Sequence, residues 1–190
     1  SEDYFVLPEF SIAHITKDSI EVTDFNGNVI EPKMLTLDWD IKNSGKKGFP
    51  FYMEKEIMEQ PEVITKTIES RITDDMPDFS AENVDDEIFT KCDNVTVIAC
   101  GTAMHAGLIG KYSFEKIAKI PCEVDIASEF RYDEPMLNKN DLVVIISQSG
   151  ETADTLAALR EAKEQGIRTL AIVNVVGSSI AREADHVFYT

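Results

Sequence analysis

Apolar and polar positions follow two different patterns along the chain, which divide it into a β-rich first part and a longer second part. Over the first 41 residues, short apolar runs are separated by turn residues, a pattern typical of antiparallel strands. The predicted strands are residues 4–7, 11–15 and 20–23, and Asn26-Gly27 between apolar flanks favours a hairpin turn. Because so few strands cannot bury both of their faces, we expect them to be the end of a larger β domain.

The pattern becomes helical from Tyr52 onward, beyond a polar stretch at 42–50 that we interpret as a linker. A broken apolar stripe predicts a helix, with Pro61 as a kink or boundary. The stripe consists of Ile57, Met58, Ile64 and Ile68. A further short helix is expected over 84–89.

From residue 95 onward, runs of Val, Ile and Ala alternate with helical segments. The predicted strands are 95–100, 123–127, 142–147, 169–174 and 186–189. The predicted helices are 103–119, with Leu108, Tyr112 and Ile117 facing inward, then 152–165 and 178–183. Strands of this composition, joined by helices, indicate a parallel sheet that is covered on both faces. We therefore expect an α/β fold, a three-layer sandwich with a five-stranded, mostly parallel sheet, preceded by the short β-hairpin segment.

Composition and charge narrow the range of partners. Acidic residues outnumber basic ones 35 to 18, giving a formal net charge of −17, which disfavours a nucleic-acid partner. The same charge repels a small phosphorylated ligand only weakly beyond ~8–10 Å in physiological salt. No apolar run approaches the ~20 residues of a membrane helix. The three cysteines include no CxxC pair or zinc spacing, so we expect no metal, no cofactor and a reducing cytoplasmic location.

Two strand-to-helix junctions carry the candidate chemistry. Cys100-Gly101-Thr102-Ala103 follows the first strand of the α/β part, and the hydroxyl-rich SQSGETADT, residues 147–155, follows the third. Ligands of open parallel sheets bind beyond the carboxyl ends of the strands, and helix N-termini favour anions. Gly101 and Gly150 would let the backbone approach closely, so the two junctions are typical of a phosphate cradle without Lys or Arg.

A plainer interpretation of the same hydroxyl groups stays open. This interpretation is capping plus turn chemistry: Ser and Thr at helix starts are ordinary N-caps, each worth ~1 kcal/mol, and they account for one hydroxyl per junction. Neither junction is a nucleotide motif, because GxxxxGK[ST] and GxGxxG are both absent from the sequence. The excess of donors over what capping requires favours a binding site.

Four segments, taken in order, resemble a known family. CGTAMHAG, EVDIASEFRY, SQSGETADTL and NVVGSSIAREAD are similar to the first sugar isomerase (SIS) domain of the glutamine–fructose-6-phosphate aminotransferases. The resemblance runs from about Phe49 to Thr190, and FYMEKEIMEQP is similar to the segment that enters that domain. The earlier hairpins resemble the last strands of the family's glutaminase domain. The implied organisation is residues 1–48, glutaminase strands plus linker, and residues 49–190, the first SIS domain with its leading helices.

The resemblance implies a bifunctional enzyme that releases ammonia from glutamine and installs it on fructose 6-phosphate to give glucosamine 6-phosphate and glutamate. It also implies a homodimer. By motif position, six residues would bind the sugar phosphate. They are Thr102, Ala103, Ser147, Gln148, Ser149 and Thr152. Many family members carry Ser where this chain has Ala103, so only the backbone is expected to act at that position.

The chain departs from the family in the residues that perform chemistry. The family's N-terminal cysteine nucleophile has no counterpart before Cys92, and its catalytic lysine, glutamate and histidine belong to a second SIS domain and tail beyond Thr190. We therefore expect a fragment with a binding half-site, no catalytic residue and no activity alone. The alternative is a sugar-phosphate-sensing SIS module of a regulator, but regulators usually carry a basic helix-turn-helix segment, and the acidic hairpins here favour the enzyme.

Overall fold

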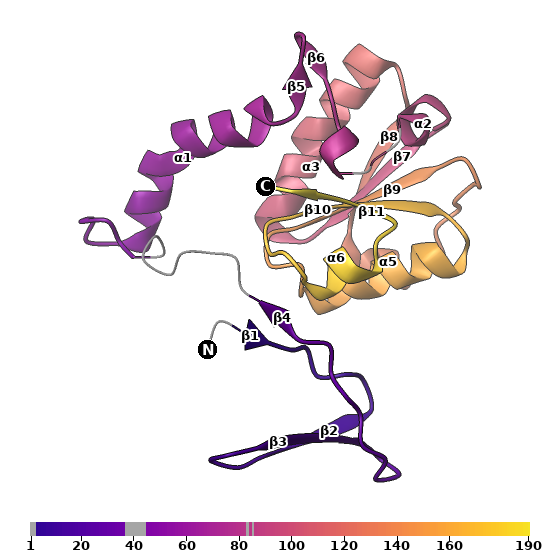
Figure 1. Cartoon of the computed structure of the whole chain (residues 1–190). Helices are drawn as coiled ribbons and strands as arrows, with labels where there is room; N and C mark the ends of the chain where they lie inside the picture. The colour runs from indigo at the N-terminus through magenta and orange to yellow at the C-terminus, as the bar shows by residue number, and fades with distance from the viewer. Residues whose placement is uncertain (1–2, 37–44, 83, 85) are drawn as a thin grey trace. The chain divides into compact units, whose positions relative to one another are not determined.

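The structure is a computed structural model of the 190-residue chain that describes residues 3–36, 45–82, 84 and 86–190 (Figure 1). The chain forms two compact units, residues 1–60 and 61–190. The end of the predicted strand region, 37–41, and the start of the predicted linker, 42–44, lie outside the described residues.

The first unit contains short antiparallel strand pairs. β1 (Asp3–Tyr4) pairs with β4 (Leu35–Thr36), and β2 (Ser11–Ile15) pairs with β3 (Ile20–Asp24). The turn predicted at Asn26-Gly27 is present, because the Asp24 carboxylate accepts hydrogen bonds from the N–H groups of Asn26 and Asn28, both at 2.8 Å. A single antiparallel bridge between Thr23 and Val29 follows it. The predicted strand 4–7 is shorter than expected.

A long helix and a small hairpin come before the sheet. α1 (Tyr52–Glu69) continues through Pro61, so this proline marks neither of its ends. β5 (Ile72–Thr73) and β6 (Met76–Pro77) form a two-stranded antiparallel hairpin, which is followed by a 3-10 turn at Ser80–Glu82 and by α2 (Glu87–Thr90).

The second unit contains the predicted five-stranded sheet. Its strands are β7 (Val95–Ala99), β8 (Cys122–Ile126), β9 (Leu142–Ser147), β10 (Arg168–Val173) and β11 (His186–Tyr189). Their order is β11-β10-β9-β7-β8, and all four pairings are parallel. Because β8 and β9 lie on opposite sides of β7, the direction of the strand order reverses between β7 and β9, which is the switch point where open α/β sheets bind ligands.

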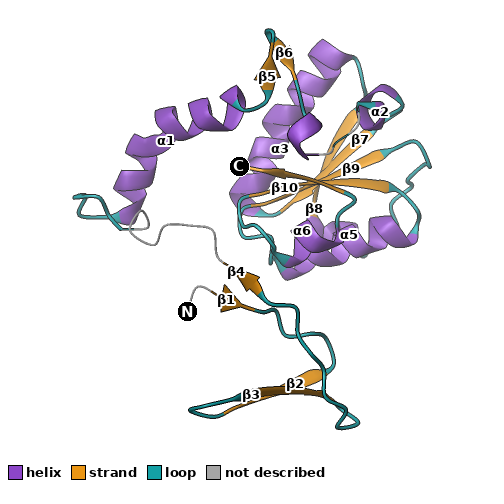
Figure 2. Cartoon of the chain, viewed as in Figure 1, coloured by secondary structure: helices purple, strands orange, loops and turns teal. Residues whose placement is uncertain are grey.

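Helices cover both faces of this sheet (Figure 2). α3 (Gly101–Ser113), continued by a π-helical turn at Phe114–Ala118, covers one face together with α2; α4 (Ala127–Phe130), α5 (Ala153–Glu164) and α6 (Ser179–Glu183) cover the other. Alternate residues of β9 belong to the two cores: Val143 and Ile145 face α5, while Leu142 and Val144 face α2 and α3. The predicted three-layer α/β sandwich is confirmed.

One detailed prediction about α3 was wrong. Leu108, Tyr112 and Ile117 were expected to face inward, but they are 41%, 65% and 82% exposed. The helix instead buries Gly107, where an added Cβ would lie 2.8 Å from Val97 Cγ1. The absence of a side chain at this position lets the helix approach the sheet closely, and this turns the larger apolar residues outward.

Candidate functional site

The two junctions predicted to bind a ligand leave the sheet next to each other. Ala99, the last residue of β7, is in register with Ile146 of β9. The segments that follow, 100–103 and 147–152, therefore start at the same edge of the sheet, on the two sides of the switch point. Segment 100–103 leads into α3 and segment 147–152 leads into α5.

Hydroxyl groups organise the 147–152 loop from within. The buried Ser147 Oγ accepts a hydrogen bond from the Gly150 N–H at 3.1 Å and lies 3.3 Å from Thr152 Oγ1. Ser149 Oγ accepts from the Glu151 N–H at 3.3 Å. Gly150 has a φ of +65°, a conformation that favours glycine. The exposed Gln148 and Ser149 stand at the surface of this loop.

Neither of the two helices at the switch point has a side-chain cap among the described residues. Cys100 is the N-cap residue of α3 and Thr152 is the N-cap residue of α5, and neither side chain bonds to the first turn of its helix. N-capping therefore does not account for the hydroxyls here, whereas turn chemistry accounts for part of them, because Ser147 and Ser149 accept hydrogen bonds from N–H groups within the loop. Free N–H groups at a helix N-terminus, together with the helix dipole, favour an anion.

The remaining predicted residues lie on the β7 side. Thr102 is exposed and Ala103 half-buried, both in the first turn of α3. The buried Thr155 of α5 donates a hydrogen bond from Oγ1 to Cys100 Sγ at 3.8 Å. This contact packs the start of α5 against the end of β7 and links the two junctions.

A third segment, which the sequence reasoning did not assign to the site, contacts the 147–152 loop. It consists of the loop after β10 and the first two residues of α6, together called the 174–180 loop, and three of its N–H groups donate to the neighbouring loop. The pairs are Asn174 with Gln148 O (3.2 Å), Ile180 with Gly150 O (3.0 Å) and Ser179 with Glu151 Oε1 (2.7 Å). The sequence signal that could have assigned this loop to the site was its position directly after β10, the strand that pairs with β9.

The charged side chains at the junctions are mostly acidic. Asp154, in the first turn of α5, pairs with Arg131 at 3.3 Å, and Glu151 bonds to the 174–180 loop. Within residues 3–36, 45–82, 84 and 86–190, no group of three or more His, Cys, Asp and Glu side chains could hold a metal ion. None of the described helices is long and apolar enough to cross a membrane.

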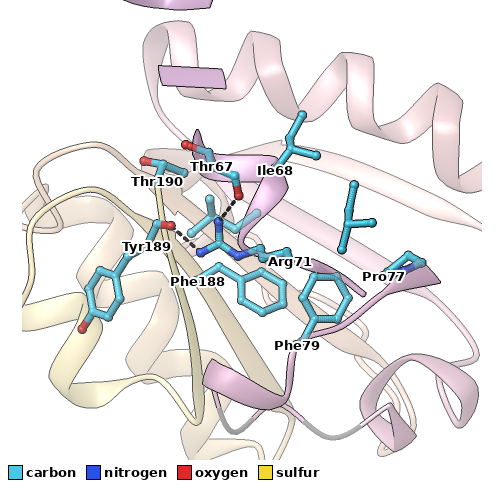
Figure 3. Close-up of a pocket in the computed structure, with 10 residues that line it drawn as sticks. Thr67, Ile68, Arg71, Pro77, Phe79, Phe188, Tyr189 and Thr190 are labelled. Atoms are coloured by element: carbon cyan, nitrogen blue, oxygen red, sulfur yellow. Dashed lines mark hydrogen bonds between the residues drawn. The ribbon is translucent and has the colours of Figure 1, made fainter. Parts of the chain in front are cut away.

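A separate pocket of about 360 Å³ has no residue of the two junctions in its lining (Figure 3). Its lining consists of Thr67, Ile68, Arg71, Ile72, Pro77, Phe79, Ile172, Phe188, Tyr189 and Thr190. The Arg71 guanidinium donates to Glu82 Oε1 (2.6 Å), Thr67 O (2.7 Å) and Tyr189 O (2.6 Å). Since protein acceptors engage this cation and the other lining surfaces are largely apolar, the pocket lacks the chemistry of an anion site.

Comparison with known proteins identifies the family to which the chain belongs. Residues 88–190 match the family model of the SIS domain, and the chain belongs to the SIS domain family. Over its whole length it is 48% identical to the glutamine–fructose-6-phosphate aminotransferase (isomerizing) of Clostridium tetani, of which it covers 31%. The resemblance stated from the sequence is confirmed. The chain thus spans about a third of the length of such curated relatives.

Two solved structures agree with this placement. The C-terminal domain of glucosamine-fructose-6-phosphate aminotransferase from Francisella tularensis matches with a TM-score of 0.72 and 44% identity, over 77% of this chain and 41% of that one. The sugar isomerase domain of the RpiR transcription factor from Sphaerobacter thermophilus matches with a TM-score of 0.53 and 25% identity, over 69% of this chain and 75% of that one.

Proposed function

We propose that this chain supplies the sugar-phosphate-binding half-site of a glutamine–fructose-6-phosphate aminotransferase. The observation that carries the proposal is the pair of helix N-termini without side-chain caps at the switch point, flanked by the hydroxyls of the 147–152 loop. In the whole enzyme, fructose 6-phosphate and glutamine would be converted to glucosamine 6-phosphate and glutamate. The identity with relatives of that name over the full chain supports this choice of substrates.

The proposed phosphate contacts come from neutral donors. Ser147 Oγ accepts from the Gly150 N–H and lies 3.3 Å from Thr152 Oγ1, so its O–H would turn from Thr152 to donate to a phosphate oxygen when the ligand binds. Ser149, Thr152 and the Gln148 amide would add donors on the same side. Thr102 and the backbone N–H of Ala103 would contact the phosphate from the start of α3. The two helix dipoles add a favourable field for the dianion.

The chemical step requires groups that this half-site does not contain. Imine formation needs a nucleophilic amine, and proton transfer between C1 and C2 of the sugar needs a base. The predicted contact residues are hydroxyls, one amide and backbone N–H groups, none of which takes these roles. We therefore propose that the chain binds the sugar phosphate and does not convert it.

A regulatory SIS module is the second candidate, supported by the match to the sugar isomerase domain of the RpiR transcription factor. The aminotransferase is favoured because its structural match has the higher TM-score, 0.72 against 0.53, and because the sequence similarity extends through the strands of the first unit. We also propose that the chain forms a homodimer. We further propose a reducing cytoplasmic location, supported by the odd number of cysteines, three, without CxxC spacing.

Two measurements on the 190-residue chain test the proposed function. In an NMR titration with fructose 6-phosphate, shifts should be confined to residues near Thr102 and 147–152 and should disappear in Ser149→Ala or Thr152→Ala. Ser113→Ala, an exposed hydroxyl at the far end of α3, is the matched control. Binding should be weak, because each missing hydrogen bond to the sugar costs ~1 kcal/mol, or about a factor of five in affinity.

The second measurement is an assay for glucosamine 6-phosphate with ammonia supplied. No product is expected. Product formation, or shifts centred on residues outside the two junctions, would contradict the half-site proposal.

A further inference from the structure

The 147–152 loop contains an acid, Glu151, in the middle of the segment proposed to bind an anion. A carboxylate close to a phosphate opposes binding, because two negative charges a few ångströms apart repel each other, strongly so where water is partly excluded. The place of this side chain therefore matters for the site. Its Oε1 accepts a hydrogen bond from the Ser179 N–H at 2.7 Å, at the start of α6.

The sheet order shows on which side this bond lies. β9 stands between β7 and β10. Thr102 follows β7, whereas Ser179 follows β10. The carboxylate of Glu151 is thus bonded on the β10 side of its loop, across β9 from the β7 junction. Its charge is compensated there by an N–H group of the first turn of α6.

Glu151 also connects the 174–180 loop to Ser149, one of the proposed phosphate donors. Its own N–H donates to Ser149 Oγ at 3.3 Å, while its carboxylate accepts from Ser179. The other two hydrogen bonds between the loops run from backbone to backbone. Among these three bonds, the one from Ser179 is therefore the one that a side-chain substitution can remove.

We propose that Glu151 is a positioning residue. Through its bond to Ser179 it holds the 147–152 loop, and with it the Ser149 hydroxyl, in the shape that accepts an anion, and it keeps its own charge on the side away from the switch point. The identity of the anion as a hexose 6-phosphate rests on the proposed function, whereas the control of loop shape does not.

Two substitutions separate positioning from charge alone. In Glu151→Gln, the amide oxygen still accepts from Ser179 while the charge is gone. In Glu151→Ala, both the bond and the charge are lost. Glu164 is an exposed acid at the last residue of α5, the helix that follows the 147–152 loop. Glu164→Ala is therefore the control for the loss of a negative charge alone. The readouts are amide hydrogen exchange at Ser179 and Gly150 and the Kd for fructose 6-phosphate by NMR.

We expect Glu151→Gln to keep the slow exchange of the Ser179 amide and to bind as tightly as the unsubstituted chain or a few-fold more tightly. Glu151→Ala should exchange at Ser179 about tenfold faster and bind about tenfold more weakly, in keeping with the loss of one hydrogen bond to a charged acceptor. Glu164→Ala should change neither quantity.

Equal behaviour of the Gln and Ala variants would overturn the proposal, since Glu151 would then be a solvated charge. Faster exchange in Glu151→Ala with an unchanged Kd would overturn it as well, because the bond would then be structural only. If the unsubstituted chain does not bind fructose 6-phosphate, the proposed function fails, and the exchange rates at Ser179 and Gly150 alone decide whether Glu151 positions the loop.

Discussion

Gly101 and Gly150 share a backbone conformation but differ in their surroundings. Their φ angles are +57° and +65°, in the region that residues other than glycine rarely adopt. A Cβ on Gly101 would meet no described atom within 4 Å, whereas a Cβ on Gly150 would lie 2.0 Å from Ser178 Oγ and 2.5 Å from Ser178 Cβ. Gly101 is thus required by the backbone alone, and Gly150 by both the backbone and its contact with the 174–180 loop.

Alanine substitutions should separate these two requirements. Gly101→Ala should lower the free energy of unfolding by ~1–2 kcal/mol, the cost of a left-handed residue with a Cβ. Gly150→Ala should lower it by ~1–3 kcal/mol more, because the buried Ser178 has to move. Urea unfolding measures both, and Gly150→Ala combined with Ser178→Gly should recover part of the difference. Equal losses at the two glycines would contradict the packing argument.

At the residue scale, the sequence predicted where the candidate site lies but not which contacts hold the 147–152 loop in place. The hydroxyls of 147–152 stand directly after an apolar strand, so their place at the sheet edge followed from local pattern alone. The contact of Gly150 with Ser178 joins residues 28 positions apart and depends on β10 lying beside β9. No local pattern carries that information.

At the scale of single elements, α3 packs against the sheet through the close approach of its backbone at Gly107 rather than through large side chains. Gly107 faces Val97 and Val124 of the sheet, with an added Cβ only 2.8 Å from Val97 Cγ1 and 3.3 Å from Val124 Cγ1. Periodicity of large apolar residues is the usual guide to a buried helix face. It failed here because the buried residue of the helix is a glycine, whereas the continuous apolar run of β9 correctly predicted a strand that is buried on both sides.

Two glycines of α3 should respond to alanine in opposite directions. Gly110→Ala should raise the free energy of unfolding by ~0.5–1 kcal/mol, because alanine is the better helix former and the added methyl meets no described atom within 4 Å. Gly107→Ala gains the same propensity but overpacks the contact with Val97, which costs ~1–3 kcal/mol, so a net loss is expected. Thermal or urea unfolding measures both changes. A stabilising Gly107→Ala would contradict the prediction and show that Val97 can move aside at little cost.

The pairing of α5 with α6 should make stability depend on acid pH. Arg160 donates to both Glu183 oxygens, at 2.7 and 2.6 Å, and these hydrogen bonds lower the pKa of Glu183 below its ordinary value of 4.5. A lowered pKa means that the folded state holds the proton less tightly than the unfolded state does. The stabilisation is therefore present above pH 4.5 and is lost as the pH falls through the folded-state pKa.

Unfolding by urea at pH 7 and near pH 4 checks this dependence. Glu183→Gln should be less stable than the unsubstituted chain at pH 7 and should lose less stability on acidification. Glu164→Gln, an exposed acid on α5, serves as the control. Parallel pH profiles for the Glu183→Gln variant and the unsubstituted chain would contradict the assignment.

At the scale of the whole molecule, several large apolar side chains on α1 and α3 are exposed. On α1, Ile57, Ile64 and Ile68 are 56%, 55% and 49% exposed. On the outer side of α3, Ile109 and Tyr112 are 72% and 65% exposed. Exposed apolar residues that recur along one element are typical of interaction surfaces. We predict that the α1 residues mediate homodimerisation.

Sedimentation velocity tests this prediction. The chain should sediment as a dimer at high micromolar concentration, and Ile64→Glu combined with Ile68→Glu should shift it to monomer. Ile109→Glu, an equally polar change on α3, should leave the dimer intact. A monomer at all concentrations, or disruption by the α3 variant alone, would count against α1 as the contact.

The strand order β11-β10-β9-β7-β8 also determines how the sheet can assemble while the ribosome is still releasing the chain. β8 joins one side of β7, β9 joins the other side, β10 then joins β9, and β11 joins β10. Each emerging strand meets an edge that already exists, and none has to be inserted between two paired neighbours. Both junctions of the candidate site can therefore form once β9 has paired, and the 174–180 loop that contacts residues 147–152 follows β10, before β11 is made.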